Sequence, residues 1–306
     1  MGNTAYSDIT DLRTAEALSG MVIQLLAARD ALPNHPALMY AGSAEGSGSA
    51  VVKVPHIGLE GYNTLAATSD GAAVTATTIS DGATTITVAR KSRAYAPTDL
   101  AKLTGPAGQL DAAAFASDAV RSAAATLVEL VAAVTDGFTT TVGSTTVNLV
   151  ISDFLAAKAA LANANVPGPY LCILHPQQWA DLVSDIATND SNGSVVFDPA
   201  SPEAIARLGT GFQGDLFGVQ VFTSTFVPTA NAAADRAGGM FGRGAVIWAD
   251  AAPIVDVPDS QILLGGKILF ERDRDALSGL TNYVTHAYMG VSKGIDSAGV
   301  SIISDA

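Results

Sequence analysis

A glycine-rich segment, Gly209-Thr-Gly-Phe-Gln-Gly214, has the G-x-G-x-x-G spacing found in dinucleotide-binding proteins. In that chemistry the glycines follow a strand and open a helix, whose N-terminal N–H groups contact a pyrophosphate. Here the order is reversed, because a helix-like stretch at 202–208 precedes the glycines and a strand-like stretch follows them. We interpret the segment as a glycine-rich turn and expect no cofactor. A nucleotide-binding enzyme that uses Gly209–Gly214 is kept as an alternative function.

The other residue types that support catalysis or metal binding are dispersed along the chain. The histidines at 35, 56, 175 and 286 show neither H-E-x-x-H nor another spacing of paired metal ligands. His175 stands before a proline at a strand-to-helix turn, which favours a cap or a packed ring over a general base. No G-x-S-x-G motif occurs, and Cys172 lies in an apolar run where a thiol is usually inert. We therefore predict no catalytic, cofactor-binding or metal-binding residue, and a protein that is not an enzyme.

The composition excludes further classes of protein. The 306 residues include 16 Lys and Arg against 29 Asp and Glu, and this net charge of −13 argues against a sequence-reading DNA-binding protein. Hydrophobic residues make up 48% and charged residues only 15%, which is unusually apolar for a monomer. The most apolar stretch, 112–134, is interrupted by Asp118, Arg121 and Glu129, so no membrane span is expected. We therefore expect apolar surface to be buried between subunits.

The first hundred residues predict an amphipathic helix and a projecting hairpin. Residues 11–29 place their leucines on one stripe of a 3.6-residue period. Residues 51–95 alternate Val, Thr and Ile around two Ser-Asp-Gly turns, which predicts a β-hairpin or meander with arms at 51–69 and 74–95. Each arm could extend about 65 Å, well beyond a globule whose radius of gyration is about 19 Å. A polar hairpin is unstable alone, so we expect it to lie on a neighbouring molecule.

The rest of the chain predicts a mixed α+β body. A long alanine-rich helix is expected at 112–134 with Asp111 as its cap, and a shorter helix at 152–163 with Ser152 as its cap. The continuous apolar run at 170–174 predicts a strand that is buried on both faces. Further helices and strands are expected at 175–186, 203–208, 219–223, 245–248, 266–274 and 281–291.

Charge is distributed unevenly and predicts contacts between copies of the chain. Residues 46–97 contain 4 basic and 3 acidic residues, whereas 181–260 contain 10 acidic and 3 basic residues. Basic side chains beside an acidic body favour complementary contacts. A second charged group forms a ladder at the start of the last strand pair. The residues that we assign to assembly contacts are Lys53, Arg90, Lys91, Arg93, Glu271, Arg272, Asp273 and Arg274.

Two segments resemble the major capsid proteins of tailed bacteriophages with the Hong Kong 97 type fold. The stretch Gly214-Asp-Leu-Phe-Gly-Val-Gln-Val-Phe-Thr-Ser-Thr-Phe-Val-Pro228 is similar to the family's G-x-L-x-G-x-P-V-x-x-S run, although Gln220 stands where proline is usual. The stretch Leu174-His-Pro-Gln-Gln-Trp-Ala-Asp-Leu182 is similar to the family's strand, proline and helix segment. The order of arm, hairpin, long helix, α/β part and returning strand pair also resembles that of the family.

The resemblance implies an α+β capsid fold with four parts. These are an N-terminal arm at 1–45, an extended loop at 46–97, a peripheral domain at 98–150 and 265–306 with its backbone helix at about 112–135, and an axial domain at 151–264.

The resemblance also implies a function and a set of partners. The expected function is that of a structural protein of the virion capsid, assembled in the host cytoplasm into hexamers and pentamers of an icosahedral shell around double-stranded DNA. The expected partners are other copies of the chain, a separate scaffolding protein, a portal and decoration proteins. Neither a membrane nor sequence-specific DNA binding is expected. The separate scaffold is expected because the chain begins with Met1 and a short arm, without a long charged helix.

Two further expectations follow from relatives of this fold. Some members link a lysine to an asparagine covalently; here Lys53 or Lys91 with Asn282, near Glu271, match the local motifs poorly, so we predict no such crosslink. An encapsulin-like shell that encloses enzymes in a cell shares the architecture and is the main alternative function. A surface or adhesive β-protein would suit the Thr-, Ala- and Gly-rich composition but not the α/β half of the chain.

Overall fold

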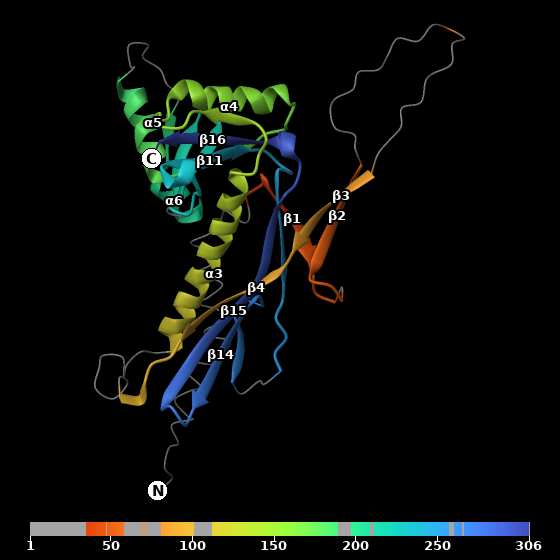
Figure 1. Ribbon diagram of the computed structural model, residues 1–306, viewed down its shortest axis with the longest axis vertical. Helices are drawn as coiled ribbons and strands as arrows, with labels where there is room; N and C mark the ends of the chain where they lie inside the picture. The colour runs from red at the N-terminus through yellow and green to blue at the C-terminus, as the bar shows by residue number, and fades with distance from the viewer. Residues whose placement is uncertain are drawn as a thin grey trace.

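One long helix and two β-sheets form the framework of the molecule (Figure 1). The computed structural model describes residues 35–46, 48–57, 70, 81–100, 112–188, 197–208, 211–256, 260–264 and 266–305. The helix predicted at 11–29 and the cap predicted at Asp111 lie outside the described residues.

The larger sheet lies at the end of the molecule that carries α4 (Ile151–Asn163) and α5 (Pro176–Thr188) (Figure 1). The apolar run Tyr170–Leu174 lies inside this sheet, is almost fully buried and pairs with a strand on each side. Its strands, in sheet order, are β5 (Thr141–Gly143), β16 (Gly299–Asp305), β11 (Asp235–Phe241), β6 (Tyr170–Leu174), β9 (Val219–Thr223), β8 (Phe212–Leu216) and β7 (Phe197–Pro199), with β10 (Thr229–Ala230) also beside β11. The helices of this part are α4 (Ile151–Asn163), α5 (Pro176–Thr188) and α6 (Pro202–Leu208).

The smaller sheet is built around the longest strand, β15 (Leu280–Lys293). Residues 280–287 pair antiparallel with β14 (Ile268–Asp275), which confirms the predicted terminal strand pair. The remaining strands are β1 (Leu38–Ser43), β12 (Val246–Ala251), β13 (Gln261–Leu264) and β4 (Ala89–Tyr95).

Helix α3 (Ala112–Thr135) extends between the two sheets (Figure 1). Its alanine-rich sequence allows close approach, and Ala119 and Val120 pack in one buried cluster with Phe270 of the smaller sheet. At its other end the buried Thr135 hydroxyl lies 2.8 Å from the Ala237 carbonyl oxygen, to which it donates. The long helix predicted at 112–134 is confirmed, and both of its ends are attached to a sheet.

The predicted hairpin is confirmed only near its base. Strands β2 (Val51–Ile57) and β3 (Asp81–Thr87) pair antiparallel over seven residues and project to one side of the body (Figure 1). The predicted second arm at 74–95 is wrong as a single strand, because β4 leaves the hairpin after Val88 and pairs with β15. The reason is burial, because Ile86 and Val88 pack on the smaller sheet and are only 0% and 7% exposed. This packing fixes the chain where it leaves the hairpin.

Helix α4 begins differently from the prediction. Ser152 is not its cap, since the N-cap residue is Val150 and makes no side-chain cap hydrogen bond. The Ile151 N–H instead donates to Asp185 Oδ2 of α5 at 2.8 Å. Tertiary packing of two helices has therefore replaced the local cap.

Most other predicted elements agree with the structure, but the strands do not follow the predicted domain boundaries. Residues 299–305 were assigned to the peripheral part, yet β16 pairs with β11 and β5 in the larger sheet. Conversely, β12 and β13 come from the range 151–264 and pair in the smaller sheet. Val300 and Ile302 of β16 are buried in the core of the larger sheet, and this burial explains why the end of the chain joins that sheet.

Candidate assembly surface

The structure gathers seven of the eight predicted assembly residues on one sheet. Arg90, Lys91 and Arg93 lie in β4, and residues 271–274 lie in β14, with β15 between the two strands. Lys53 lies apart from them, exposed on β2 of the hairpin. Seven of the predicted residues therefore lie in one sheet, divided between its two faces, and the eighth lies apart on the projecting hairpin.

Strand β4 is an exposed basic edge, but one of its arginines is engaged within the chain. Residues 89–94 are all exposed. Arg93 Nη1 donates to Ser122 Oγ of α3 at 2.7 Å and lies 3.6 Å from Asp118 Oδ2. The same guanidinium lies 5.0 Å from the centre of the Tyr95 ring. Arg93 thus attaches β4 to α3, and Arg90 and Lys91 remain the better candidates for contacts with another copy.

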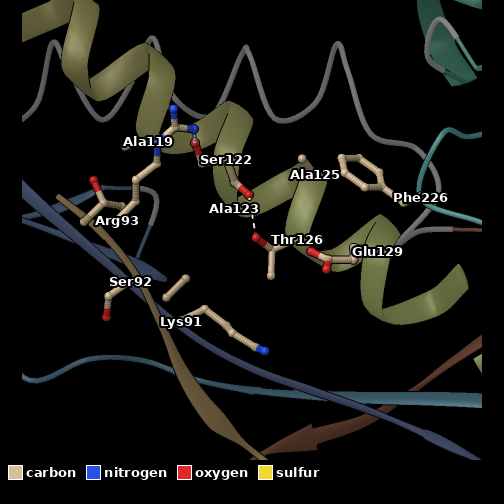
Figure 2. Close-up of a pocket in the computed structure, with 12 residues that line it drawn as sticks. Lys91, Ser92, Arg93, Ala119, Ser122, Ala123, Ala125, Thr126, Glu129 and Phe226 are labelled. Atoms are coloured by element: carbon tan, nitrogen blue, oxygen red, sulfur yellow. Dashed lines mark hydrogen bonds between the residues drawn. The ribbon is translucent and has the colours of Figure 1, made fainter. Parts of the chain in front are cut away.

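A groove of about 360 Å³ separates β4 from α3 (Figure 2). Most of the side chains on its helix wall are small, among them Ala119, Ala123 and Thr126. The groove is also lined by Lys91, by Glu129 and by Phe226, which is 44% exposed. The groove therefore combines an alanine-rich wall with charges of both signs.

The far end of the smaller sheet combines an ion pair with exposed apolar residues. Arg274 Nη1 and Nη2 donate to the two carboxylate oxygens of Asp99 at 3.1 and 2.8 Å. Leu277 in the adjacent turn is 101% exposed, and Leu100 is 69% exposed. Large apolar side chains in water are candidates for contacts between molecules. No sequence pattern predicted a role for Asp99, Leu100 or Leu277.

A second cluster was also missed and fixes β1 to the smaller sheet. Tyr40 of β1 donates its hydroxyl to Asp250 Oδ1 of β12 at 2.7 Å. Lys267 pairs with the other oxygen of Asp250 and lies over the rings of Tyr40 and Trp248, at 5.3 and 5.6 Å from their centres. Burial, followed by the contact with Asp250, raises the pKa of Tyr40 to about 12. These four residues come from two strands and the turn before β14, and no local motif in the sequence connects them.

The glycine-rich segment has no nucleotide-binding geometry in the part that the structure describes. It follows α6 and leads into β8, which confirms the reversed order. Gly214 has φ of +137°, and a Cβ there would lie 2.2 Å from the Asp198 carbonyl oxygen on β7. This glycine is required by close packing of neighbouring strands.

The surroundings of His175 and Cys172 indicate roles in the fold rather than in catalysis. His175 Nδ1 accepts the Gln177 N–H at 3.3 Å, which agrees with a cap at the start of α5. Cys172 is fully buried in β6, and this burial raises the pKa of its thiol. Within the described ranges, no group of three or more His, Cys, Asp or Glu side chains is placed to hold a metal ion. None of the described helices combines the length and apolar character needed to cross a bilayer.

Solved structures with a similar fold include phage capsids and an encapsulin. The capsid of Ralstonia phage GP4 has a TM-score of 0.57 at 12% identity, with 88% of this chain and 87% of that chain covered. The head of Helicobacter pylori bacteriophage KHP40 has a TM-score of 0.56 at 11% identity, with 91% of each chain covered. The SrpI encapsulin of Synechococcus elongatus PCC 7942 has a TM-score of 0.54 at 11% identity, with 88% and 84% covered. A search of curated proteins found no match.

These similarities show that the chain has the capsid fold of the Hong Kong 97 type. The family described as phage capsid protein matches residues 82–295 of the sequence. The chain belongs to this family and is a bacteriophage major capsid protein, a component of the virion capsid.

Proposed function

We propose that this capsid protein assembles in the host cytoplasm into hexamers and pentamers of an icosahedral shell around the double-stranded DNA of a tailed phage. The observation that carries this proposal is the hairpin that projects from the body and is anchored at its base. A contact that repeats around a rotation axis closes into a ring, and rings of five and six can together close a shell.

The base of the hairpin is suited to hold its arms in a defined direction. Ile86 is fully buried in a cluster with Ile247 and Ala249 of β12. A Cβ added at Gly290 of β15 would lie 2.2 Å from the Thr87 carbonyl oxygen, so the hairpin lies directly on the sheet backbone. Beyond this base, a two-stranded ribbon has little core, and packing on a neighbouring subunit supplies the missing burial.

Charge complementarity also supports packing of the hairpin on a neighbouring subunit. Lys53 is exposed on the hairpin, and Arg90 is exposed on the basic edge strand. Asp198 and Glu203 are exposed on the part of the chain that has an excess of acidic residues. We propose that basic side chains of one subunit face this acidic surface of the next.

The net charge of −13 supports a container that holds DNA without binding it tightly. We further propose that the larger sheet forms the axial part of each ring and the smaller sheet its periphery. A separate scaffolding protein, a portal and decoration proteins are proposed as partners.

An encapsulin-like compartment with protein cargo is the second candidate function. The observation that favours it is the similarity in fold to the SrpI encapsulin, whose TM-score falls in the same range as those of the phage capsids. The membership of the chain in the phage capsid protein family favours the first candidate.

Light scattering on the purified full chain, followed by negative-stain microscopy of the same fractions, tests the shell. We expect hollow particles of megadalton mass, formed by the chain alone or after addition of its scaffolding protein. Particles purified from infected cells should contain nuclease-protected double-stranded DNA. Protein cargo without protected DNA would favour the compartment, and a 31 kDa monomer under all of these conditions would contradict both candidates.

A further inference from the structure

A row of polar side chains crosses the smaller sheet on the face opposite helix α3. Ser92 of β4 lies directly across from His286 of β15. Leu269 of β14 pairs with the same histidine, and Glu271 follows two residues later on the same face. Figure 2 shows the side chain of Ser92 pointing away from α3, whereas that of Arg93 reaches Ser122 on the helix.

Two contacts in this row favour one position for the ring proton of His286. Ser92 Oγ lies 2.6 Å from His286 Nδ1, and His286 Nε2 lies 3.4 Å from Glu271 Oε2. The second contact is an ion-pair distance, and the negative charge of the carboxylate favours a proton on the ring nitrogen that faces it, Nε2. With the proton on Nε2, Nδ1 is unprotonated and accepts the hydroxyl proton of Ser92. The imidazole then lies between a hydroxyl and a carboxylate, which is the order of groups in an activated nucleophile.

Burial separates the roles of the three residues. Ser92 is exposed on the edge strand, whereas the side chains of His286 and Glu271 are 13% and 28% exposed. Glu271 is held from its other side, because Gln261 Nε2 donates to Oε1 at 2.5 Å. The nucleophile is thus accessible to a reagent, while the base and its carboxylate are sheltered and fixed.

We propose that Ser92 is an activated hydroxyl and a site of covalent modification by acylating or phosphonylating electrophiles. With a fluorophosphonate, a bond forms between Ser92 Oγ and phosphorus as the P–F bond breaks. Fluoride leaves with the bonding electron pair, and the hydroxyl proton moves to His286 Nδ1. Glu271 stabilises the resulting imidazolium, which then loses its proton to water. This reactivity goes beyond the shell function and does not depend on assembly.

The test is labelling of the purified full chain with a fluorophosphonate probe, followed by digestion and mass spectrometry. We expect the label on Ser92, and we expect Ser92→Ala to remove it. His286→Gln should slow labelling of Ser92 by about 100-fold, the usual contribution of a positioned base. Glu271→Gln should slow it less. Ser122→Ala is the matched control, since the Ser122 hydroxyl accepts from Arg93 and should leave the labelling rate of Ser92 unchanged.

Thermal unfolding of each variant separates loss of reactivity from loss of the fold. Should a variant fail to fold, the natural chain is compared in buffer and in urea, and labelling of Ser92 should be fast only in buffer. The proposal is overturned if folded Ser92 reacts no faster than Ser122 or than unfolded Ser92. It is also overturned if a folded His286→Gln variant keeps the original rate.

Discussion

His35 and Gln220, which are 185 residues apart in the sequence, are joined by a hydrogen bond of 2.6 Å between Nε2 and Oε1. The Ala37 N–H donates to Nδ1 of the same ring at 3.1 Å, so Nδ1 is unprotonated and Nε2 is the donor to Gln220. Protonation of Nδ1 would place two donors against each other. The neutral ring therefore fixes the start of the described chain to strand β9 of the larger sheet.

Acidification should weaken this attachment. Burial lowers the pKa of His35 below its usual 6.5, although Gln220 and Asp215 partly offset the effect. The unfolded chain then binds more protons than the folded chain, so the stabilisation present above pH 6.5 is lost as the pH falls toward the folded pKa. Urea unfolding between pH 7.5 and 5.5 should show a decreasing free energy of unfolding, by at most about 1.4 kcal/mol per pH unit for this histidine.

The variant His35→Gln separates this effect from other titrating groups. His175 also has a pKa lowered by burial and should contribute in the same direction. Asp215 has the opposite effect, because burial and Asp198 raise its pKa. The free energy of unfolding that it contributes is present below pH 3.8 and is lost as the pH rises through its folded pKa. The pH dependence of His35→Gln should be shallower than that of the natural chain. An equal slope in the two proteins would contradict the role of His35.

The anchor of the hairpin should depend on one buried side chain. Ile86→Ala removes packing against Ile247 and Ala249 and should lower the free energy of unfolding by about 2–5 kcal/mol, as for other large-to-small changes in a core. Assembly should also decrease, because the loosened hairpin loses its direction. The neighbouring exposed residue provides the control, and Thr85→Ala should change stability by less than about 0.5 kcal/mol. Equal effects of the two substitutions would show that the hairpin base is not anchored through Ile86.

The hydroxyl of Tyr40 should stabilise the attachment of β1. Tyr40→Phe leaves Asp250, which is 5% exposed, with one hydrogen-bond donor fewer and should cost about 1–3 kcal/mol in urea unfolding. Spectroscopic titration should also lose one tyrosine that ionises near pH 12. Tyr288→Phe is the control, since no hydrogen bond from its hydroxyl occurs among the described residues. A Tyr40→Phe protein as stable as the control would exclude a stabilising contact with Asp250.

Charge reversal on the hairpin should weaken contacts between subunits. Lys53→Glu should raise the protein concentration needed for assembly by about tenfold, the equivalent of one favourable contact of about 1.4 kcal/mol. Added salt should reduce this difference, since exposed charges are screened. Arg243→Glu makes the same change of charge at an exposed position on the acidic part of the chain. If light scattering shows that both variants need the same increase in protein concentration to assemble, net charge rather than the hairpin controls assembly.

Elements with strong local patterns were predictable from the sequence. The apolar run at 170–174 and the alanine-rich stretch at 112–134 predict β6 and α3 correctly, because each local pattern is strong enough to set the structure without help from distant contacts. The division between β3 and β4 was not predictable, since it depends on burial of Val88 against a strand 150 or more residues later in the chain. The cap of α4 was missed for a similar reason, because Asp185 replaces Ser152 through the packing of α5.

The candidate surface was predictable in composition but not in geometry. The basic residues of β4 are evident as a charge cluster, and their position beside β15 follows from pairing with residues 283–289. The cluster gives no indication that Arg93 binds Ser122. Ser92 and His286 are 194 residues apart, and neither lies in a motif, so their contact required the sheet register.

A cryo-electron microscopy reconstruction of the assembled particle tests the central claim most directly. We expect rings of six and five subunits in a closed icosahedral shell, with the β2–β3 hairpin of each subunit lying on the next subunit of the ring. We expect Lys53 within contact distance of acidic side chains of that neighbour. A hairpin folded onto its own subunit, or an assembly without such rings, would contradict the account.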